Sequence, residues 1–139
     1  MTITINIPEK YSQVSAGEKV YFETEIKWPE NDMRKDLKME YSIKNQNGEE
    51  IAYLKVLKAI ETQASFMDSI SIPESTKAGA YKIFLSIKDY EELNQEVAVS
   101  FRIVGKSSFD TYLIIILGIV GLIAVVVVIM LFILIRKKG

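Results

Sequence analysis

The sequence predicts an all-β head, an antiparallel two-sheet β-sandwich of about seven strands, followed by one transmembrane α-helix. Residues 112–135 form a run of 24 residues without a charged side chain, so all 17 basic and 18 acidic residues lie elsewhere. In the rest of the chain, apolar and polar residues alternate in short runs, which turn residues separate at intervals of roughly 8 to 12 residues. Helical periodicity is almost absent from that part, which favours strands.

Seven alternating runs mark seven strands in residues 1–104, which we predict to form one domain. Successive side chains of a strand point to opposite faces, so one face of each strand is expected to be buried. The runs cover residues 3–7, 20–26, 37–43, 49–57, 62–72, 81–87 and 97–103. Asn47 and Gly48 predict a hairpin turn, because glycine supplies the positive φ that such turns need. The stretch 56–60 is interpreted as a strand or an irregular connection.

One phase of this alternation predicts the hydrophobic core. The predicted core residues are Val20, Phe22, Ile26, Leu37, Met39, Tyr41, Ile43, Phe66, Ile70, Tyr81, Ile83, Leu85, Val97, Val99 and Phe101. Residues of the other phase are mostly polar and are expected to face solvent.

The composition excludes most of the common catalytic chemistry. The chain contains no histidine and no cysteine, so it has no Cys/His zinc site, no cysteine nucleophile, no disulfide and no Ser-His-Asp triad. Residues 1–135 hold 14 basic and 18 acidic groups, and an acidic head disfavours nucleic acid as a partner. We therefore expect no enzyme activity, cofactor, metal, nucleic-acid partner or small-molecule substrate.

Three groups of polar and acidic residues suggest metal binding or hydrolysis, and each has a simpler interpretation. The loop 30–36 offers oxygen ligands but includes two cations and matches no calcium-loop spacing. The turn 89–92 is typical of a charged hairpin tip. Glu23 and Glu25 lie on one strand face about 7 Å apart, a separation compatible with glycosidase carboxylates. No cleft is indicated around them, so the solvent face of a strand is the expected setting.

The apolar run at 112–135 predicts a membrane-spanning helix. A helix rises 1.5 Å per residue, so this run extends about 36 Å, enough to cross a hydrocarbon core of roughly 30 Å. Aromatic residues at one end and basic residues at the other are expected at the two membrane interfaces. These interface residues are Phe109, Tyr112, Arg136, Lys137 and Lys138.

The basic tail, residues 136–139, is expected in the cytoplasm, because positive charge flanking a span stays on the cytoplasmic side. The head would then lie outside the cell membrane, joined to the helix by a short linker at 105–111. The first residues show neither the basic nor the apolar region of an export signal. Two alternatives follow: a signal was removed before Met1, or the protein is tail-anchored with a cytoplasmic head.

Two sets of residues are candidates for contact with partners. Gly118, Gly121 and Ala124 follow one stripe of the helix and are helix-packing candidates, although incidental glycines in an ordinary anchor are the alternative. Aromatic residues that fall on or near the polar phase of their strands, or beside a proline, are protein-binding candidates. These aromatic candidates are Tyr21, Trp28 and Tyr53.

The segment 59–73, read as AIETQASFMDSISIP, is followed by Gly79-Ala80-Tyr81. It resembles the immunoglobulin-like sandwich domains of prokaryotic, archaeal-type cell-surface proteins, in which such a strand leads to a Gly-x-Tyr at the start of the penultimate strand. The similarity covers roughly residues 12–104. It implies an immunoglobulin-like fold and a surface-exposed binding or spacer module with a C-terminal membrane anchor. The chain departs from antibody-type domains, because it lacks their cysteine pair.

Together these features predict a non-enzymatic single-pass membrane protein whose extracytoplasmic head binds protein partners. A single sandwich with a short linker and a four-residue tail suits lateral contacts in the lipid bilayer, as in a small accessory subunit of a larger membrane complex. Two alternatives remain open. One is a structural or adhesion surface protein that forms the anchoring end of a cell-envelope assembly, and the other is a tail-anchored cytoplasmic adaptor.

Overall fold

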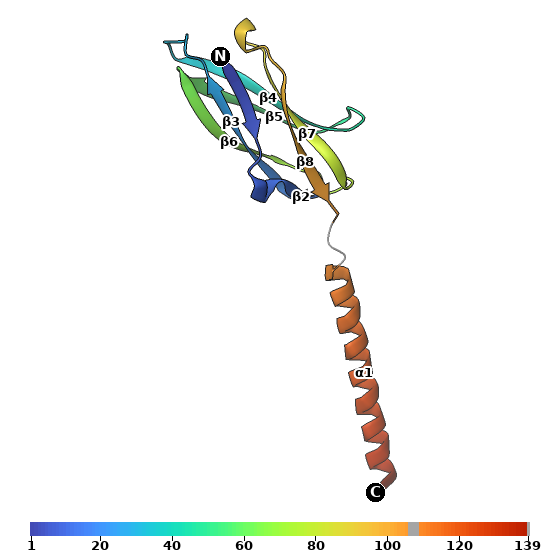
Figure 1. The fold of residues 1–139 in the computed structure, drawn as a ribbon. Coiled ribbons are helices and arrows are strands. Elements are labelled where there is room, and N and C mark those ends of the chain that lie inside the picture. Colours follow the sequence, from blue (N-terminus) through green and yellow to red (C-terminus); the bar gives the residue numbers. More distant parts are fainter. Residues whose placement is uncertain (106–108, 139) are drawn as a thin grey trace. The chain divides into compact units, whose positions relative to one another are not determined.

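The computed structural model describes residues 1–105 and 109–138, and the chain divides into two units (Figure 1). The first unit, Met1–Gly105, contains all the strands described, and the second contains the C-terminal helix. The elements are β1 (Thr2–Asn6), η1 (Glu9–Tyr11), β2 (Gln13–Ser15), β3 (Lys19–Lys27), β4 (Lys35–Asn45), β5 (Glu50–Ile60), β6 (Gln63–Ser71), β7 (Gly79–Ile87), η2 (Glu91–Leu93), β8 (Val97–Val104) and α1 (Phe109–Lys138).

The strands form two sheets that pack face to face. The smaller sheet has the order β1-β3-β6, and the larger sheet has the order β2-β8-β7-β4-β5. Neighbouring strands are antiparallel except for β2 and β8, which are parallel. Apolar side chains from both sheets form one core between them, as in other β-sandwiches. The predicted fold class is therefore confirmed.

All seven predicted strands are present, and the described part of the chain adds an eighth, β2. This strand has only three residues, too few to show alternation, and it is held by parallel pairing of Val14 with Ile103. The ambiguous stretch 56–60 is the end of β5, which runs to Ile60.

The turn between β4 and β5 contains the predicted Asn47 and Gly48. Gly48 has a φ of 80°, whereas no non-glycine residue in the described part of the chain has a positive φ. The backbone N–H of Gly48 donates to the carbonyl of Asn45, and the N–H of Asn45 donates to the carbonyl of Glu49, both at 3.0 Å. These bonds close a three-residue loop, in which only one position requires glycine.

The core follows the predicted phase of the strands with three exceptions. Twelve of the fifteen predicted core residues are buried, whereas Phe66, Val97 and Val99 are only half-buried and pack against the core. Val97 and Val99 lie on β8 of the five-stranded sheet, whose inner face a three-stranded sheet cannot cover completely, and Phe66 lies on β6, an edge strand of the smaller sheet. The structure adds further buried residues, among them Leu93 of η2.

Tyr81 joins the start of β7 to the loop before it. Its hydroxyl donates a hydrogen bond of 2.8 Å to the carbonyl of Lys77. A tyrosine near the start of the penultimate strand, bonded to the backbone a few residues upstream, is a recurring feature of immunoglobulin-like sandwiches. This contact supports the predicted immunoglobulin-like character of the head.

The helix α1 includes the predicted span and extends beyond it in both directions. It begins at Phe109 and ends at Lys138, so it takes in part of the predicted linker and tail. Residues Tyr112–Lys137 are long and apolar enough to cross a membrane, and none of the most apolar part is buried within the protein. At 1.5 Å per residue, these residues extend about 39 Å. Residues 106–108 and 139 lie outside the described residues.

Candidate functional site

Two of the three aromatic candidates are exposed on outer faces of the sheets. Tyr53 on β5 has 49% of its surface exposed, and Tyr21 on β3 has 39% exposed. The Tyr21 ring packs against Tyr11 at a tilt of 39°, with ring centroids 5.1 Å apart. Tyr53 lies opposite Ser42 of β4 on the outer face of the larger sheet. The two tyrosines belong to different sheets, so they do not form one surface.

The third aromatic candidate, Trp28, is not exposed, which corrects the sequence-based expectation. Only 6% of its surface is accessible, because its ring packs against Tyr90 at 5.6 Å between centroids. The ammonium of Lys35 lies 4.4 Å from the Trp28 ring centroid and 4.7 Å from that of Tyr90. Such cation–π contacts stabilise the packed arrangement. Trp28 therefore closes one end of the sandwich and is not available to a partner.

Asn31 also has a structural role. Its side chain is buried, and its Nδ2 donates to the carbonyls of Met33 at 2.6 Å and Glu61 at 2.7 Å. The hydroxyl of Thr62 donates to the Asn31 carbonyl at 3.2 Å. The amide thus connects the loop after β3 to the turn between β5 and β6.

Glu23 and Glu25 lie on the outer face of β3, where neighbouring side chains bind them. Glu23 accepts a hydrogen bond from the hydroxyl of Ser65, and Glu25 accepts one of 2.9 Å from Gln63. Lys27 lies 3.1 Å from Glu25. None of the cavities described contains either carboxylate. Across the described residues, no group of three or more His, Cys, Asp or Glu side chains is placed to hold a metal ion.

The outer face of β5 carries an exposed surface, of which the sequence predicted Tyr53 but not Leu57. Leu57, with 63% of its surface exposed, lies on the same face of the strand as Tyr53. Between them, Lys55 lies 2.8 Å from Glu40. On the inner face, Leu54 and Val56 are only half-buried, because β5 is an edge strand of the larger sheet. Leu57 falls on the polar phase, and this is the signal that could have identified it.

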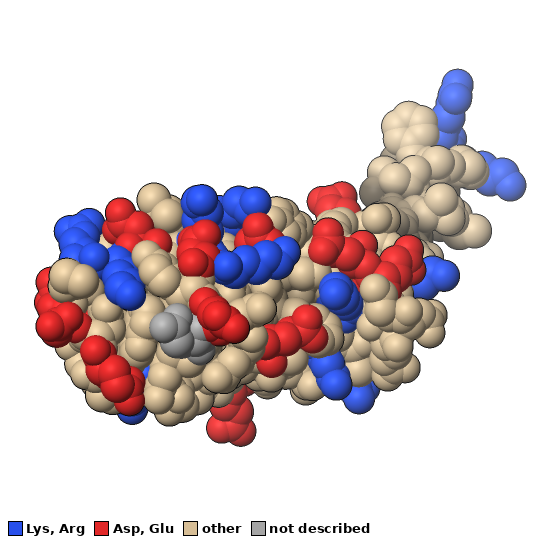
Figure 2. All heavy atoms as spheres, turned by 90° about the horizontal axis from the view of Figure 1, so that it is seen from above, with Lys and Arg blue, Asp and Glu red and all other residues tan. Residues whose placement is uncertain are grey.

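Charge on this face is balanced locally. The carboxylate of Glu40 accepts contacts from Lys55 at 2.8 Å and from Lys88 at 3.3 Å, and these two ammonium groups lower the pKa of Glu40. Glu40 in turn raises the pKa of Lys55. On the face of the head drawn in Figure 2, acidic and basic side chains are interspersed and form no single-sign patch. Exposed pairs of this kind contribute little to stability.

A further ion pair, this one largely buried, connects β5 and β6, the edge strands of the two sheets. The Nζ of Lys58 is 2.8 Å from Oδ1 of Asp68, and both side chains are largely buried. The other carboxylate oxygen of Asp68 is buried without a hydrogen-bond partner. Inward-pointing charges are a common way to prevent unwanted pairing at a sheet edge. We assign this pair a structural role.

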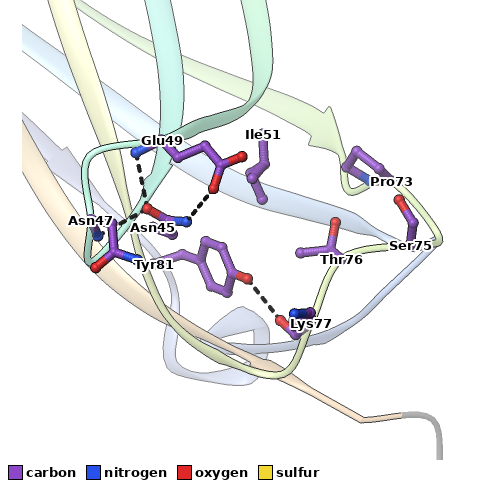
Figure 3. Close-up of a pocket in the computed structure, with 9 residues that line it drawn as sticks. All are labelled: Asn45, Asn47, Glu49, Ile51, Pro73, Ser75, Thr76, Lys77 and Tyr81. Carbon is purple, nitrogen blue, oxygen red and sulfur yellow. Dashed lines mark hydrogen bonds between the residues drawn. The ribbon is translucent and has the colours of Figure 1, made fainter.

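The largest cavity described, about 500 Å³, lies between the β4–β5 and β6–β7 loops (Figure 3). It is lined by Asn45, Asn47, Glu49, Ile51, Pro73, Ser75, Thr76, Lys77 and Tyr81. The Asn45 amide oxygen accepts the N–H groups of Asn47 and Glu49, and its amide nitrogen donates to the Glu49 carboxylate. Tyr81 bonds to the Lys77 carbonyl. These polar groups form hydrogen bonds within the protein and fix the shape of the two loops. We therefore assign the cavity a structural role.

The helix-packing candidates lie on open stretches of α1. A Cβ added at Gly118 or Gly121 would meet no atom within 4 Å. Of the predicted interface residues, Tyr112, Arg136 and Lys137 are exposed. The remaining two, Phe109 and Lys138, belong to α1, but their side chains lie outside the described part of the structure.

No family model matches the chain, and no curated protein matches its sequence. Solved structures share its fold. A β-glucuronidase of glycoside hydrolase family 2 superposes with a TM-score of 0.55 and 14% identity, over 73% of this chain and 11% of that chain. A family 2 member from Bacteroides cellulosilyticus DSM 14838 gives a TM-score of 0.52 and 11% identity, over 73% and 14% of the two chains.

A family 123 glycoside hydrolase from Clostridium perfringens gives a TM-score of 0.51 and 13% identity, over 76% of this chain and 27% of that chain. This chain therefore matches only a small part of each of these enzymes. At such low identity, the comparison establishes a shared β-sandwich fold and says nothing of activity.

Proposed function

We propose that the chain is a non-enzymatic single-pass membrane protein. Its β-sandwich head lies outside the cytoplasm and binds protein partners, and the protein acts as a small accessory subunit of a larger membrane complex. The helix α1 carries this proposal, since it presents apolar side chains on all sides and no part of the most apolar stretch is buried in the protein. An apolar surface of this extent would be unstable in water.

Lipid is the environment that suits such a helix. Its strongly apolar side chains favour insertion by on the order of 5 to 10 kcal/mol on a biological insertion scale. An α-helix pairs the backbone groups of its interior with one another, as a hydrocarbon environment requires, and α1 is helical along the whole span. The basic residues Arg136, Lys137 and Lys138 favour the cytoplasmic side for the C-terminal end, which would leave the head on the opposite side.

Two features support binding to proteins over catalysis. The chain lacks histidine and cysteine, and the largest cavity described uses its polar groups to hold its own loops. Tyr53 and Leu57, by contrast, expose apolar surface on one face of β5. Exposed aromatic residues are enriched where proteins bind one another.

The membrane partner is tested through the helix stripe. Replacing Gly118 and Gly121 with Leu fills the open stretch beside both glycines and keeps the helix apolar, so insertion is preserved. The matched control replaces Val120 and Ile123 with Leu. Each of these residues lies two positions after one of the glycines, so the control changes side chains at a similar depth in the membrane but on the opposite face of the helix. The full chain is isolated from its own membranes in a mild detergent, and co-purifying proteins are identified by mass spectrometry.

Loss of one membrane protein from the glycine variant but not from the control is the expected result. An identical set of co-purifying proteins in all three preparations would mean that the glycines are incidental. If no membrane protein co-purifies even with the unmodified chain, the role as an accessory subunit is wrong.

A further inference from the structure

The outer edge of β5 has no strand beside it in the part of the chain that the structure describes. β5 is the last strand of the larger sheet and pairs only with β4. An edge of this kind presents a row of backbone N–H and C=O groups that can pair with another strand. β5 is 11 residues long and contains no proline, so no backbone donor is missing along it.

Two features confine the free part of this edge to a short segment. At one end, the register with β4 shifts just before Ala52, and regular pairing is interrupted there. At the other end, Lys58 points into the sandwich toward Asp68, which disfavours the approach of a further strand. The segment between these features, residues 52–57, has Leu54 near its centre.

We propose that this segment binds the same segment of a second copy of the chain as an antiparallel strand, with the two-fold axis at Leu54. In an antiparallel pair, two residues that lie directly opposite each other point to the same face of the sheet. Residues of one copy that point into the sandwich must therefore lie opposite residues of the second copy that also point into the sandwich. With the axis at Leu54, Ala52 faces Val56 of the second copy, and all these inner-face residues are apolar. On the outer face, Tyr53 lies opposite Lys55 of the second copy, where an ammonium is attracted to an aromatic ring.

Other arrangements at the open edges are less favourable. An axis at Lys55 would place two lysines directly opposite each other, and facing like charges destabilise a sheet. β6 is the neighbouring edge strand, which belongs to the smaller sheet, and Asp68 near its middle points toward the core. An approaching copy of β6 would bring a second inward carboxylate close to the first. The segment around Leu54 is therefore the self-complementary part of the two edges.

The strand directions determine how such a pair is oriented. β8 runs antiparallel to β5 in each copy, because three antiparallel pairings separate them. The two copies of β8 would therefore run in opposite directions, and the two chains would continue toward their helices from opposite ends of the pair. This part of the inference rests on the proposed membrane anchor and on the proposed location of the head outside the cytoplasm. Under that proposal, the pairing joins copies of the chain that are anchored in two facing membranes. The contact is small, so many weak pairs acting together would provide the attachment.

The absence of native cysteine makes the register directly testable by disulfide formation. In the full chain in detergent, Leu54→Cys places two thiols opposite each other at the two-fold axis. The control is Met67→Cys, at a 55% exposed position on the other edge strand, β6. After mild oxidation, we expect several times more covalent dimer from Leu54→Cys than from Met67→Cys. Equal or smaller amounts would overturn the proposal.

Two substitutions of Tyr53 test the predicted pairing with Lys55 of the second copy. Both substitutions are added to Leu54→Cys. Because of the two-fold axis, residue 53 of each copy faces Lys55 of the other copy. Tyr53→Lys therefore creates two pairs of facing like charges, and Tyr53→Glu creates two pairs of facing unlike charges. We expect Tyr53→Lys to lower dimer formation roughly tenfold relative to Tyr53→Glu, since each facing charge pair changes sign. Equal effects of the two substitutions would rule out this register.

Vesicles that carry the full chain without a cysteine test the membrane arrangement. Unmodified and Tyr53→Glu vesicles should cluster, as measured by light scattering, and Tyr53→Lys vesicles should not. Disulfide formation without clustering would overturn the pairing between facing membranes. These results are independent of co-purifying proteins, so failure here leaves the proposed accessory role standing.

Discussion

The hydroxyl groups of Thr24 and Tyr41 lie 2.8 Å apart and connect the two sheets through the core of the head. Thr24 belongs to β3 of the smaller sheet and Tyr41 to β4 of the larger, and both residues are fully buried. The Tyr41 ring also packs on Phe22 with centroids 4.7 Å apart. Burial raises the pKa of the Tyr41 hydroxyl, because the ionised form would lose its hydration. The pair is therefore a neutral hydrogen bond that fixes the sheets relative to each other.

Removing one partner of this hydrogen bond should cost more than removing both. Tyr41→Phe leaves the Thr24 hydroxyl buried and unpaired, which costs about 1 to 3 kcal/mol of unfolding free energy. In the double variant Tyr41→Phe with Thr24→Val, no unpaired group remains, so stability should return toward that of the unmodified head. Urea unfolding of a chain of residues 1–105 measures both values. Strictly additive losses would contradict the interaction.

The raised pKa of Tyr41 also predicts how stability depends on pH. Below the ordinary tyrosine pKa of 10.0, the residue is neutral in both states and adds no pH dependence. Above that pH, the unfolded chain loses the proton that folded Tyr41 retains, so the free energy of unfolding falls with rising pH, by up to about 1.4 kcal/mol per unit. The difference between the unmodified chain and Tyr41→Phe isolates this effect. A difference that stays constant from pH 9 to pH 11 would argue against the burial effect.

Two leucines of opposite exposure test the core. Leu85 is fully buried on β7, and Leu85→Ala should destabilise the head by about 2 to 5 kcal/mol through lost contacts and a residual cavity. The matched control is Leu57→Ala, at a position that is 63% exposed, where the change should be within about 0.5 kcal/mol. Thermal unfolding of both variants provides the comparison. Similar losses at the two positions would show that the assigned phase of the strands is wrong.

The long strands could be predicted from the sequence because each shows several alternations between buried and exposed positions. β4, for example, buries Leu37, Met39, Tyr41 and Ile43 in strict alternation. Alternation states which face of a strand is apolar but not how far the opposite sheet extends. For that reason, Val97 and Val99 on β8 were expected in the core and are half-buried. Phe66 is half-buried because its strand, β6, lies at the edge of the smaller sheet. β2 is held by pairing with β8 and has no signal of its own.

Exposure at the candidate surfaces depends on residues distant in sequence, which limits what could be predicted there. Trp28 beside Pro29 has the local pattern of an exposed aromatic, yet Tyr90 and Lys35 from other segments cover it. Leu54 is half-buried because β5 lies at an edge, and strand order cannot be read from a single strand. Tyr21 and Tyr53, whose exposure follows from their own strand phase, are exposed as expected.

The ion pair of Lys58 and Asp68 should stabilise the edge less than its burial suggests. Lys58→Met leaves Asp68 without its partner in a largely buried position, and we expect a loss of about 1 to 3 kcal/mol. Adding Asp68→Leu removes the orphaned charge and should restore most of that stability. The double variant should also aggregate more readily, because inward charges no longer protect the edge. Unfolding and light scattering test the two effects separately, and a double variant less stable than Lys58→Met would contradict this role.

The most direct measurement concerns the single span with an outward head. Because the chain has no cysteine, one thiol can be introduced at Ser100, exposed on β8, or as an added residue after Gly139. Each version of the chain is expressed with all 139 residues, and intact cells are treated with a maleimide that cannot cross membranes. The thiol at position 100 should be labelled in intact cells, and the thiol after Gly139 only once the membrane is permeabilised. Labelling at position 100 that requires permeabilisation would place the head in the cytoplasm and contradict the proposed topology.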